Sequence, residues 1–458
     1  MKTLKNKSIL LLVLLLTLSL LLAACGTEAG QTAADAASAS QAAPVIANSN
    51  SASGASASAE GSAAASSSSS SALSSGDAFA EAFSDRDLSG EYDSAEAVEI
   101  TLNGASAEAS SEAVQISGGS VTITAAGTYV LSGSLDDGSV TVEVSKDDKV
   151  QLVLNGVSIQ SSDYAAIYVK QADKVFVTLA EGTVNTLANG GSFVQKDEND
   201  VDAVLFAKDD LTLNGTGTLR ISSPAANGVV GKDEVTVTAG VYEITAGKHA
   251  IRAKDSLAIA DGSFTLNAAD DGLHAENGDD ESLGSIYVAG GSFTIQAKDD
   301  AIHATTLLRI DGGSYQITAA EGLEATCIQI NGGDIQISAS DDGVNAAAKS
   351  SLYTPSFEMN GGTLTVSMGA GDTDGIDSNG NIVVNGGTIN VTGQSAFDCD
   401  GSAQYNGGTI IINGQQVDSI PNQFGGGMGG PGGMGGPGGD MGGGPGGGMG
   451  GPGGGKRR

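Results

Sequence analysis

Six short phrases in the second half of the chain place polar residues at a constant spacing around one apolar residue. They are KHAIRA, DDGLHA, DDAIHA, AEGLEA, DDGVNA and TDGIDS. Aligned on the apolar residue, they predict two columns of polar side chains, one residue per repeat. The first column holds Asp271, Asp300, Glu321, Asp342 and Asp374, and the second holds His274, His303, Glu324, Asn345 and Asp377.

Carboxylates stacked in this way need a counter-charge. In stacked β coils, neighbours in a column stand about 4.8 Å apart, where two carboxylates repel by roughly 1 kcal/mol in water and by several times more at a half-buried corner. Calcium takes six to eight oxygens at about 2.3 to 2.6 Å, so two oxygens on opposite sides of one ion stand roughly 5 Å apart. Asp, Glu and Asn side chains supply the oxygen-only set that a hard cation selects.

The stretch GDTDGIDSN, residues 371–379, is the most compact acidic segment and resembles a calcium loop. It is neither an EF-hand nor a nine-residue calcium repeat. An alternative interpretation makes each Asp-Gly pair a turn that needs a positive φ. The predicted calcium ligands are Asp271, Asp300, Glu321, Glu324, Asp342, Asn345, Asp372, Asp374 and Asp377.

Two histidines of the second column, His274 and His303, are of a type that can bind transition metals or act as a catalytic base. The alignment places them one repeat apart on an outward position, with no cysteine and no third histidine beside them. We therefore expect a solvated pair.

A longer repeat must position these columns. The phrases TAGVYEITA, ADGSFTLNA, AGGSFTIQA, DGGSYQITA, NGGDIQISA, NGGTLTVSM, NGGTINVTG and NGGTIIING recur at a basal period of about 21 residues. Within each phrase polar and apolar residues alternate, which is typical of a half-buried strand, and no helical period separates the copies. The pattern predicts an all-β solenoid with one coil per repeat. The strand-opening glycines are Gly240, Gly262, Gly291, Gly313, Gly333, Gly362, Gly387 and Gly408.

Two of the repeats are longer than the others. The extra residues fall at 276–284 and at 347–357, and we expect them to form loops that project from the coils on one side. Loops on a rigid scaffold are where binding sites commonly form, so these two would be the walls of a groove.

The ends of the chain differ in composition from the repeats. Residues 1–24 have the basic start and apolar run of an export signal, and the following Cys25 ends a bacterial lipobox, which predicts lipidation and an extracellular, membrane-anchored protein. Two acyl chains suffice for stable anchoring. We expect 25–96 to be an Ala/Ser-rich flexible stalk, 97–420 to be the single folded domain, and 421–458 to be a disordered Gly/Met/Pro-rich tail.

The composition limits the partners. A net charge of −33 argues against nucleic acid and against direct attraction to any polyanion. An acidic ligand would need a bridging cation. The chain has no Trp and only 4% aromatic residues, so a sugar site would be polar and ionic rather than a platform of exposed rings.

Several long segments resemble the clostridial surface family of β-helix carbohydrate-binding proteins. They are AGTYVLSGSLDDGSVTVEVSKDDKVQLVLNGVSIQSSDYAAIYVKQADKVFVTLAEGTVNTL, AKDDLTLNGTGTLRI and the ITA, AIRAKD and DDG phrases after them, covering about residues 97–415. The resemblance implies a right-handed parallel β-helix related in fold to pectate lyases, bound calcium at Asp-rich turns, and affinity for cellulose or polygalacturonate-like polymers without lyase activity. KHAIRA and AEGLEA lack the paired Asp and depart from this pattern.

Three function classes remain open. The first is a monomeric, non-catalytic, calcium-dependent binder of acidic polysaccharide or plant cell-wall glycan. The second is a polysaccharide lyase, which would need a basic residue beside the calcium, with Arg252, Lys298 and Arg309 as the near candidates. The third is a structural or adhesive solenoid in which calcium only joins the coils.

Overall fold

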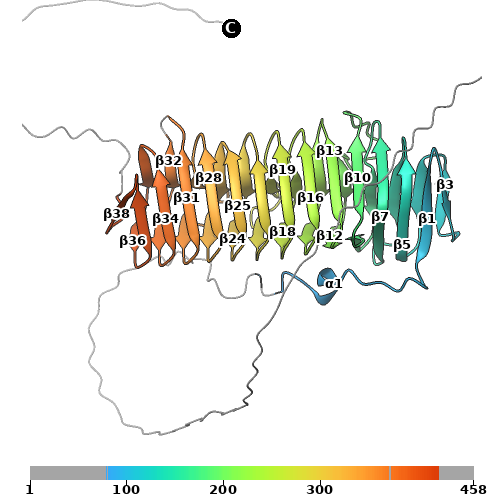
Figure 1. Cartoon of the computed structure of the whole chain (residues 1–458), viewed down its shortest axis with the longest axis horizontal. Coiled ribbons are helices and arrows are strands. Elements are labelled where there is room, and N and C mark those ends of the chain that lie inside the picture. Colours follow the sequence, from blue (N-terminus) through green and yellow to red (C-terminus); the bar gives the residue numbers. More distant parts are fainter. Residues whose placement is uncertain (1–78, 80, 371–372, 422–458) are drawn as a thin grey trace, which may run out of the picture. The chain divides into compact units, whose positions relative to one another are not determined.

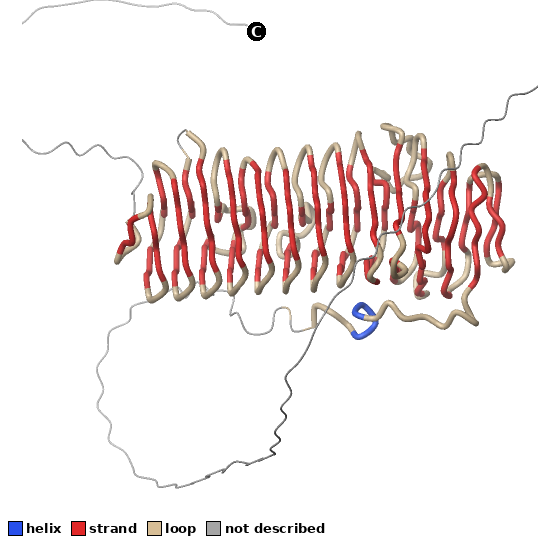
Figure 2. The backbone as a smooth tube through the Cα atoms, viewed as in Figure 1, coloured by secondary structure: helices blue, strands red, loops and turns tan. Residues whose placement is uncertain are grey.

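The computed structural model describes residues 79, 81–370 and 373–421. In this part of the chain the structure is almost entirely β, with one four-residue helix, α1 (Asp85–Leu88). Strand n pairs in parallel with strand n+3 through most of the chain. Successive pairs are formed by β16 (Val241–Ala246), β19 (Ser263–Ala268), β22 (Ser292–Gln296) and β25 (Ser314–Ala319). The chain therefore winds through three strands per coil, and the coils stack on one another (Figures 1 and 2).

The three strands of each coil form three faces, which we call faces I, II and III. Faces I and II belong to one 25-stranded sheet. The strands of face I are β9 (Lys174–Leu179), β12 (Asp210–Gly215), β15 (Glu234–Val237), β18 (Ser256–Ile259), β21 (Ser285–Val288), β24 (Leu307–Ile310), β27 (Cys327–Ile330), β30 (Ser356–Met359), β33 (Asn381–Val384) and β36 (Ala403–Tyr405). The strands of face II are β10 (Val184–Asn189), β13 (Thr218–Ser223), β16 (Val241–Ala246), β19 (Ser263–Ala268), β22 (Ser292–Gln296), β25 (Ser314–Ala319), β28 (Asp334–Ala339), β31 (Thr363–Met368), β34 (Thr388–Thr392) and β37 (Thr409–Ile412).

Face III is a separate 13-stranded sheet. Its strands are β3 (Val114–Ser117), β4 (Ser120–Ile123), β6 (Ser139–Glu143), β8 (Ile167–Gln171), β11 (Ala203–Ala207), β14 (Asn227–Gly231), β17 (Ile251–Ala253), β20 (Leu273–Ala275), β23 (Asp300–Ala304), β26 (Glu321–Ala325), β29 (Val344–Ala346), β32 (Asp374–Ser378) and β35 (Ser395–Cys399). The long strands β5 (Gly127–Leu135) and β7 (Lys149–Ser161) bend from face I into face II.

Both ends of the stack carry antiparallel hairpins. At the N-terminal end β1 (Val98–Gly104) pairs with β2 (Ala107–Ala109), and β3 pairs with β4. At the C-terminal end β37 pairs with β38 (Gln415–Val417). These hairpins occupy sheet edges that would otherwise present open backbone groups to another chain.

The core is a set of inward side chains stacked coil on coil. Val, Ile and Leu fill most of it, and four aromatic rings stack on face II, with centroids 5.1 Å apart for Tyr242 and Phe264, 4.6 Å for Phe264 and Phe293, and 4.6 Å for Phe293 and Tyr315. The alternation predicted for SFTIQA is present, since Phe293 and Ile295 are buried and Thr294 is exposed.

The glycines that open the face II strands have a left-handed backbone. All eight predicted positions have a positive φ, from +75° at Gly387 to +141° at Gly262. At Gly387 a Cβ atom would also lie 2.8 Å from the backbone of Gly361 and Gly362 on the adjacent coil. Glycine is therefore required here both by the positive φ and by the close approach of the adjacent coil.

Replacing Gly387 by alanine should lower the free energy of unfolding by about 1 to 3 kcal/mol, because both the positive φ and the crowded coil corner resist a side chain. Urea denaturation followed by circular dichroism measures this. Gly278→Ala is the matched control, because Gly278 has open space around its Cβ position and should change stability by less than about 0.5 kcal/mol. Equal stability of the two variants would contradict the explanation.

One part of the predicted stalk is wrong. Residues 84–90 fall inside the 25–96 segment, yet they pack on the coils. Asp87, in α1, is 3% exposed and forms an ion pair of 2.8 Å with Lys174 of β9. Asn214 donates hydrogen bonds to the carbonyls of Asp87 and Ser89, and Figure 1 shows α1 lying alongside the stack. We call residues 84–90 the strap.

Candidate functional site

The strand register of face III brings the predicted columns together. Asp300 pairs with Glu321, and His303 pairs with Glu324. Glu324 pairs in turn with Asn345, and Asn345 with Asp377. At the start of β23 the backbone N–H of Asp300 donates to Asp271 Oδ1 at 3.0 Å. The corresponding N–H of Asp374 donates to Asp342 Oδ1 at 2.9 Å.

The glycine of the DDG phrase has a different role from the one considered in the alternative interpretation. Gly272 and Gly343 do not have positive φ. A Cβ atom at Gly272 would instead lie 2.5 Å from Ile295 Cγ2, and one at Gly343 would collide with the side chain of Val366. The glycine is thus required by close packing against face II, and a turn with positive φ is not the reason for it.

The histidines are not a solvated pair, and this prediction is wrong. His274 is 5% exposed, and the side chain of His303 is 13% exposed. His274 Nδ1 lies 2.6 Å from Asp271 Oδ2, and His303 Nδ1 lies 2.7 Å from Asp300 Oδ2 and 2.8 Å from Glu324 Oε2. A third histidine, His249, lies on the preceding coil, with its ring centroid 4.1 Å from that of His274.

The burial of these histidines has a local cause. In the strand β20, Leu273 and Ala275 belong to the core, and His274 between them is buried because its ring stacks between those of His249 and His303. His249 was missed because it occupies, in the KHAIRA phrase, the register position that an Asp holds in the next two coils. Its neighbour Arg252 pairs with His274 in the strand register.

The two inserted loops contact each other. Residues 276–284 connect β20 to β21, and residues 347–355 connect β29 to β30. Glu281 of the first loop accepts hydrogen bonds from Ser350 Oγ at 2.8 Å and from the Ser351 backbone at 3.0 Å. Lys349 of the second loop forms an ion pair of 2.7 Å with Glu324.

A hollow of about 500 Å³ lies between these loops and face III. Its lining carries charges of both signs, from Glu276, Asp279, Glu281, His303 and Lys349. The hollow thus adjoins the middle of the two columns, at the His303 coil, and it is walled by both insertions.

The carboxylates of the columns have pKa values that depend on their partners. Burial acts to raise the pKa of Glu324, but hydrogen bonds from His303 and Lys349 outweigh it and lower the pKa. His303, although buried, has its pKa raised to about 10 by hydrogen bonds to Asp300 and Glu324. Burial likewise opposes a lowered pKa at Asp271, where hydrogen bonds with His249 and His274 prevail. Burial lowers the pKa of His274 itself.

Further along the columns the balance is different. Burial and the nearby Glu324 carboxylate raise the pKa of Glu321 to about 8. Burial raises the pKa of Asp342 to about 6, and burial together with repulsion from Asp342 raises that of Asp377 to about 6. In the described residues no Lys, Arg or His forms an ion pair with Glu321, Asp342 or Asp377. From Glu321 onward the columns therefore lack the cationic partners that hold Asp271 and Glu324 ionised.

The described residues contain four groups of side chains that could hold a metal ion. Within each group, the potential ligand atoms lie within 4.8 Å of one another. Two of them contain only oxygen donors and two mix histidine nitrogen with carboxylate oxygen. Asp342, Asp374 and Asp377 are in none of these groups, and Asp372 and Cys25 lie outside the described residues. The groups are Asp300, Glu321 and Glu324; Asp270, Asp271 and Asp299; His249, Asp271 and His274; and Asp271, Asp300 and His303.

Asp270 and Asp299 are not among the predicted ligands, although they are the first Asp of two DDG-type phrases. Arg309, a possible lyase residue, does not lie near the columns as expected. Arg309 pairs in register with Tyr287 on face I and binds Asp311 with a nitrogen–oxygen distance of 2.8 Å. It therefore lies on a different face of the coils from face III.

These features define the class of protein as an all-β stack of parallel coils with an acidic, histidine-containing face. A family described as carbohydrate-binding domain-containing protein matches residues 117–373 and again 324–419. The chain belongs to this family.

Two similar proteins add detail. A carbohydrate-binding domain-containing protein of Acetivibrio thermocellus is 34% identical over 128 residues, which are 28% of this chain and 45% of that relative. The match thus spans less than half the length of the relative. A solved structure described as the polysaccharide lyase-like protein from C. thermocellum, gadolinium derivative, has 28% identity and a TM-score of 0.47, covering 52% of this chain and 94% of that one. In the part that the structure describes, no helix has the length and apolar character needed to cross a membrane.

Proposed function

We propose that this protein is a calcium-dependent, non-catalytic binder of acidic polysaccharide, built on a right-handed parallel β-helix and held at the cell surface through Cys25. Membership in a carbohydrate-binding domain family supports a sugar ligand. The net charge of −33 supports a bridging cation, because an acidic polymer would otherwise be repelled.

The arrangement that carries the proposal is the oxygen-only group of Asp300, Glu321 and Glu324 beside the hollow. Asn345 donates from Nδ2 to Glu321 at 2.9 Å and to Glu324 at 3.3 Å. Its buried Oδ1 has no hydrogen-bond partner in the described residues. A buried carbonyl oxygen without a donor costs free energy, and it is a ligand that calcium accepts.

The donor atoms are of the type that calcium accepts, and the ion would replace His303 and Lys349 as the counter-charge of Asp300 and Glu324. The residues that would hold the ion are Asp300, Glu321, Glu324 and Asn345, and its charge would favour the ionised form of Glu321, whose pKa is about 8. When bound, calcium supplies open coordination positions for uronate carboxylates. Asp271, Asp342, Asp372, Asp374 and Asp377 remain predicted ligands of further ions along the columns.

The test is retention of the full chain on immobilised polygalacturonate, with cellulose as a parallel matrix. We expect retention in calcium and release by a calcium chelator. Glu321→Gln should weaken calcium binding at least tenfold, measured by calorimetry with a soluble oligogalacturonate present. Glu112→Gln removes an exposed carboxylate from a loop and serves as the matched control with unchanged binding.

Three outcomes would contradict the proposal. Retention that survives the chelator would remove the role of calcium. Calcium-dependent melting without retention on either matrix would favour the purely structural solenoid. Unsaturated products that absorb in the ultraviolet would show that the protein is a lyase.

A further inference from the structure

All three histidines of the chain lie in one stack. The sequence contains three histidines, and they stand on consecutive coils of face III or directly before its strands. The ring centroids are 4.1 Å apart for His249 and His274 and 4.8 Å apart for His274 and His303, with the rings inclined by 22° and 24°. Folding thus brings every imidazole of the chain to one place.

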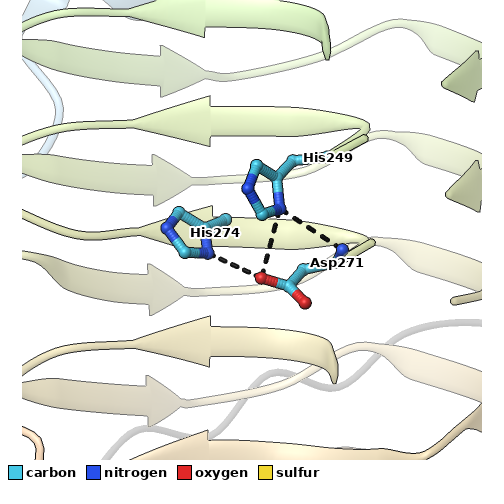
Figure 3. Close-up of side chains that lie close together, drawn as sticks. All are labelled: His249, Asp271 and His274. Atoms are coloured by element: carbon cyan, nitrogen blue, oxygen red, sulfur yellow. Dashed lines mark hydrogen bonds and ion pairs between the residues drawn. The ribbon is translucent and has the colours of Figure 1, made fainter. Parts of the chain in front are cut away.

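Two of these imidazoles face the same carboxylate oxygen. His274 Nδ1 lies 2.6 Å from Asp271 Oδ2, and His249 Nδ1 lies 3.2 Å from the same atom. Figure 3 shows both rings turned toward Asp271 from two coils. The Asp271 backbone N–H also lies 3.3 Å from His249 Nδ1, a long contact that an ion would displace. Ligand atoms around a tetrahedral ion with bonds of about 2.0 to 2.1 Å stand about 3.3 Å apart, so only small shifts are needed.

The outer nitrogen of each ring also faces a carboxylate. His249 Nε2 lies 3.6 Å from Asp270 Oδ2, and His274 Nε2 lies 3.4 Å from Glu276 Oε2. His274 is 95% buried, being 5% exposed, and its Nε2 makes no hydrogen bond in the described residues. Metal-binding histidines usually present their second nitrogen to a carboxylate in this way, which fixes the ring and strengthens the ligand.

The donor types separate this group from the calcium group. Calcium selects oxygen ligands, whereas imidazole nitrogen suits zinc and related divalent transition metals. We propose that His249, His274 and Asp271 bind a divalent transition metal of the zinc class. Three protein ligands leave one position for water or another donor. This site shares Asp271 with the predicted calcium ligands, but it uses none of Asp300, Glu321, Glu324 and Asn345, the four residues of the calcium group that carries the proposed function, and it does not depend on sugar binding.

The experiment uses the full chain without a polyhistidine tag, because a tag would add imidazoles. Histidine labelled with ¹⁵N gives signals from only three rings. Titration with Zn²⁺ should shift the Nδ1 resonances of His249 and His274 much more than that of His303. Calorimetry should show one strong Zn²⁺ site, and its affinity should fall at least tenfold in His249→Gln. Asp261→Asn removes an exposed carboxylate from a corner of the neighbouring coil and should leave zinc affinity unchanged.

The calcium result and the zinc result can be separated. His249→Gln should keep calcium-dependent retention on polygalacturonate, and excess calcium should not displace zinc from the unmodified chain. Zinc binding unchanged in His249→Gln, no shift of the His249 and His274 signals, or equal shifts of all three rings would each overturn the proposal. The labelled unmodified chain decides the question even if the variant does not fold.

Discussion

Replacing Asp87 by alanine is expected to release the strap from the coils and to cost about 3 to 5 kcal/mol, the range for breaking a buried ion pair. The Asp87 and Lys174 side chains are only 5% and 14% exposed, so the change would leave the Lys174 ammonium without its counter-charge. Thr212 would also lose its carboxylate acceptor. Urea denaturation measures the loss of stability, and limited proteolysis measures exposure of residues 84–90.

Asp85→Ala is the control for this substitution. Asp85 belongs to the same helical turn but is exposed and makes no ion pair in the described residues. It should change stability by less than about 0.5 kcal/mol. If Asp87→Ala is no more sensitive to urea or protease than Asp85→Ala, the strap is not held by this ion pair.

The same contact sets a pH dependence. Burial acts to raise the pKa of Asp87, but hydrogen bonds from Lys174, Ser84 and Thr212 prevail and lower it below the ordinary 3.8. A carboxylate with a lowered folded pKa contributes stability above its unfolded pKa, and that contribution is lost as the pH falls through the folded value. The strap should therefore stay protected from an acid protease at pH 5 and lose protection progressively as the pH falls below the ordinary 3.8, a difference absent in Asp87→Ala.

Replacing Phe293 by alanine should be the most damaging change in the core. The Phe293 ring is 1% exposed and stacks between Phe264 and Tyr315, nearly parallel to both. Its removal leaves a cavity in the middle of the ring stack and should cost about 3 to 5 kcal/mol. Chemical denaturation followed by tyrosine fluorescence measures this, since Tyr315 adjoins the cavity.

Thr294→Ala is the matched control, because Thr294 is the next residue of β22 and points outward. It should change stability by less than about 0.5 kcal/mol. Phe293→Leu should recover part of the loss by filling some of the space. A Phe293→Ala variant that unfolds at the same urea concentration as Thr294→Ala would contradict this account of the core.

Much of the coil architecture could be predicted because it repeats. A glycine such as Gly387 is required for the same two reasons in every coil, so eight copies made its position evident. The register of Asp300 with Glu321 and the placement of the two inserted loops followed from the same alignment. Handedness is not encoded in such a pattern, and it stays a prediction.

The contacts that occur only once could not be predicted in this way. Asp87 and Lys174 are far apart in the sequence, and nothing in the composition of the preceding segment indicates that they meet. His274 was expected in water because alternation assigns it to the outer side of its strand, whereas the rings of His249 and His303 stack on it there. His249 was overlooked because it replaces an Asp at its position in the repeat.

The hairpins at both ends of the stack have a consequence for how this molecule can change in size. The sheets end in the hairpins β1–β2 and β3–β4 at one end of the stack and in β37–β38 at the other. The coils between these hairpins pair with one another through the same kind of parallel contacts. Duplicating one internal coil would therefore extend both columns of polar side chains by a single step and leave the end hairpins unchanged. The length of the acidic face can grow in units of about one coil.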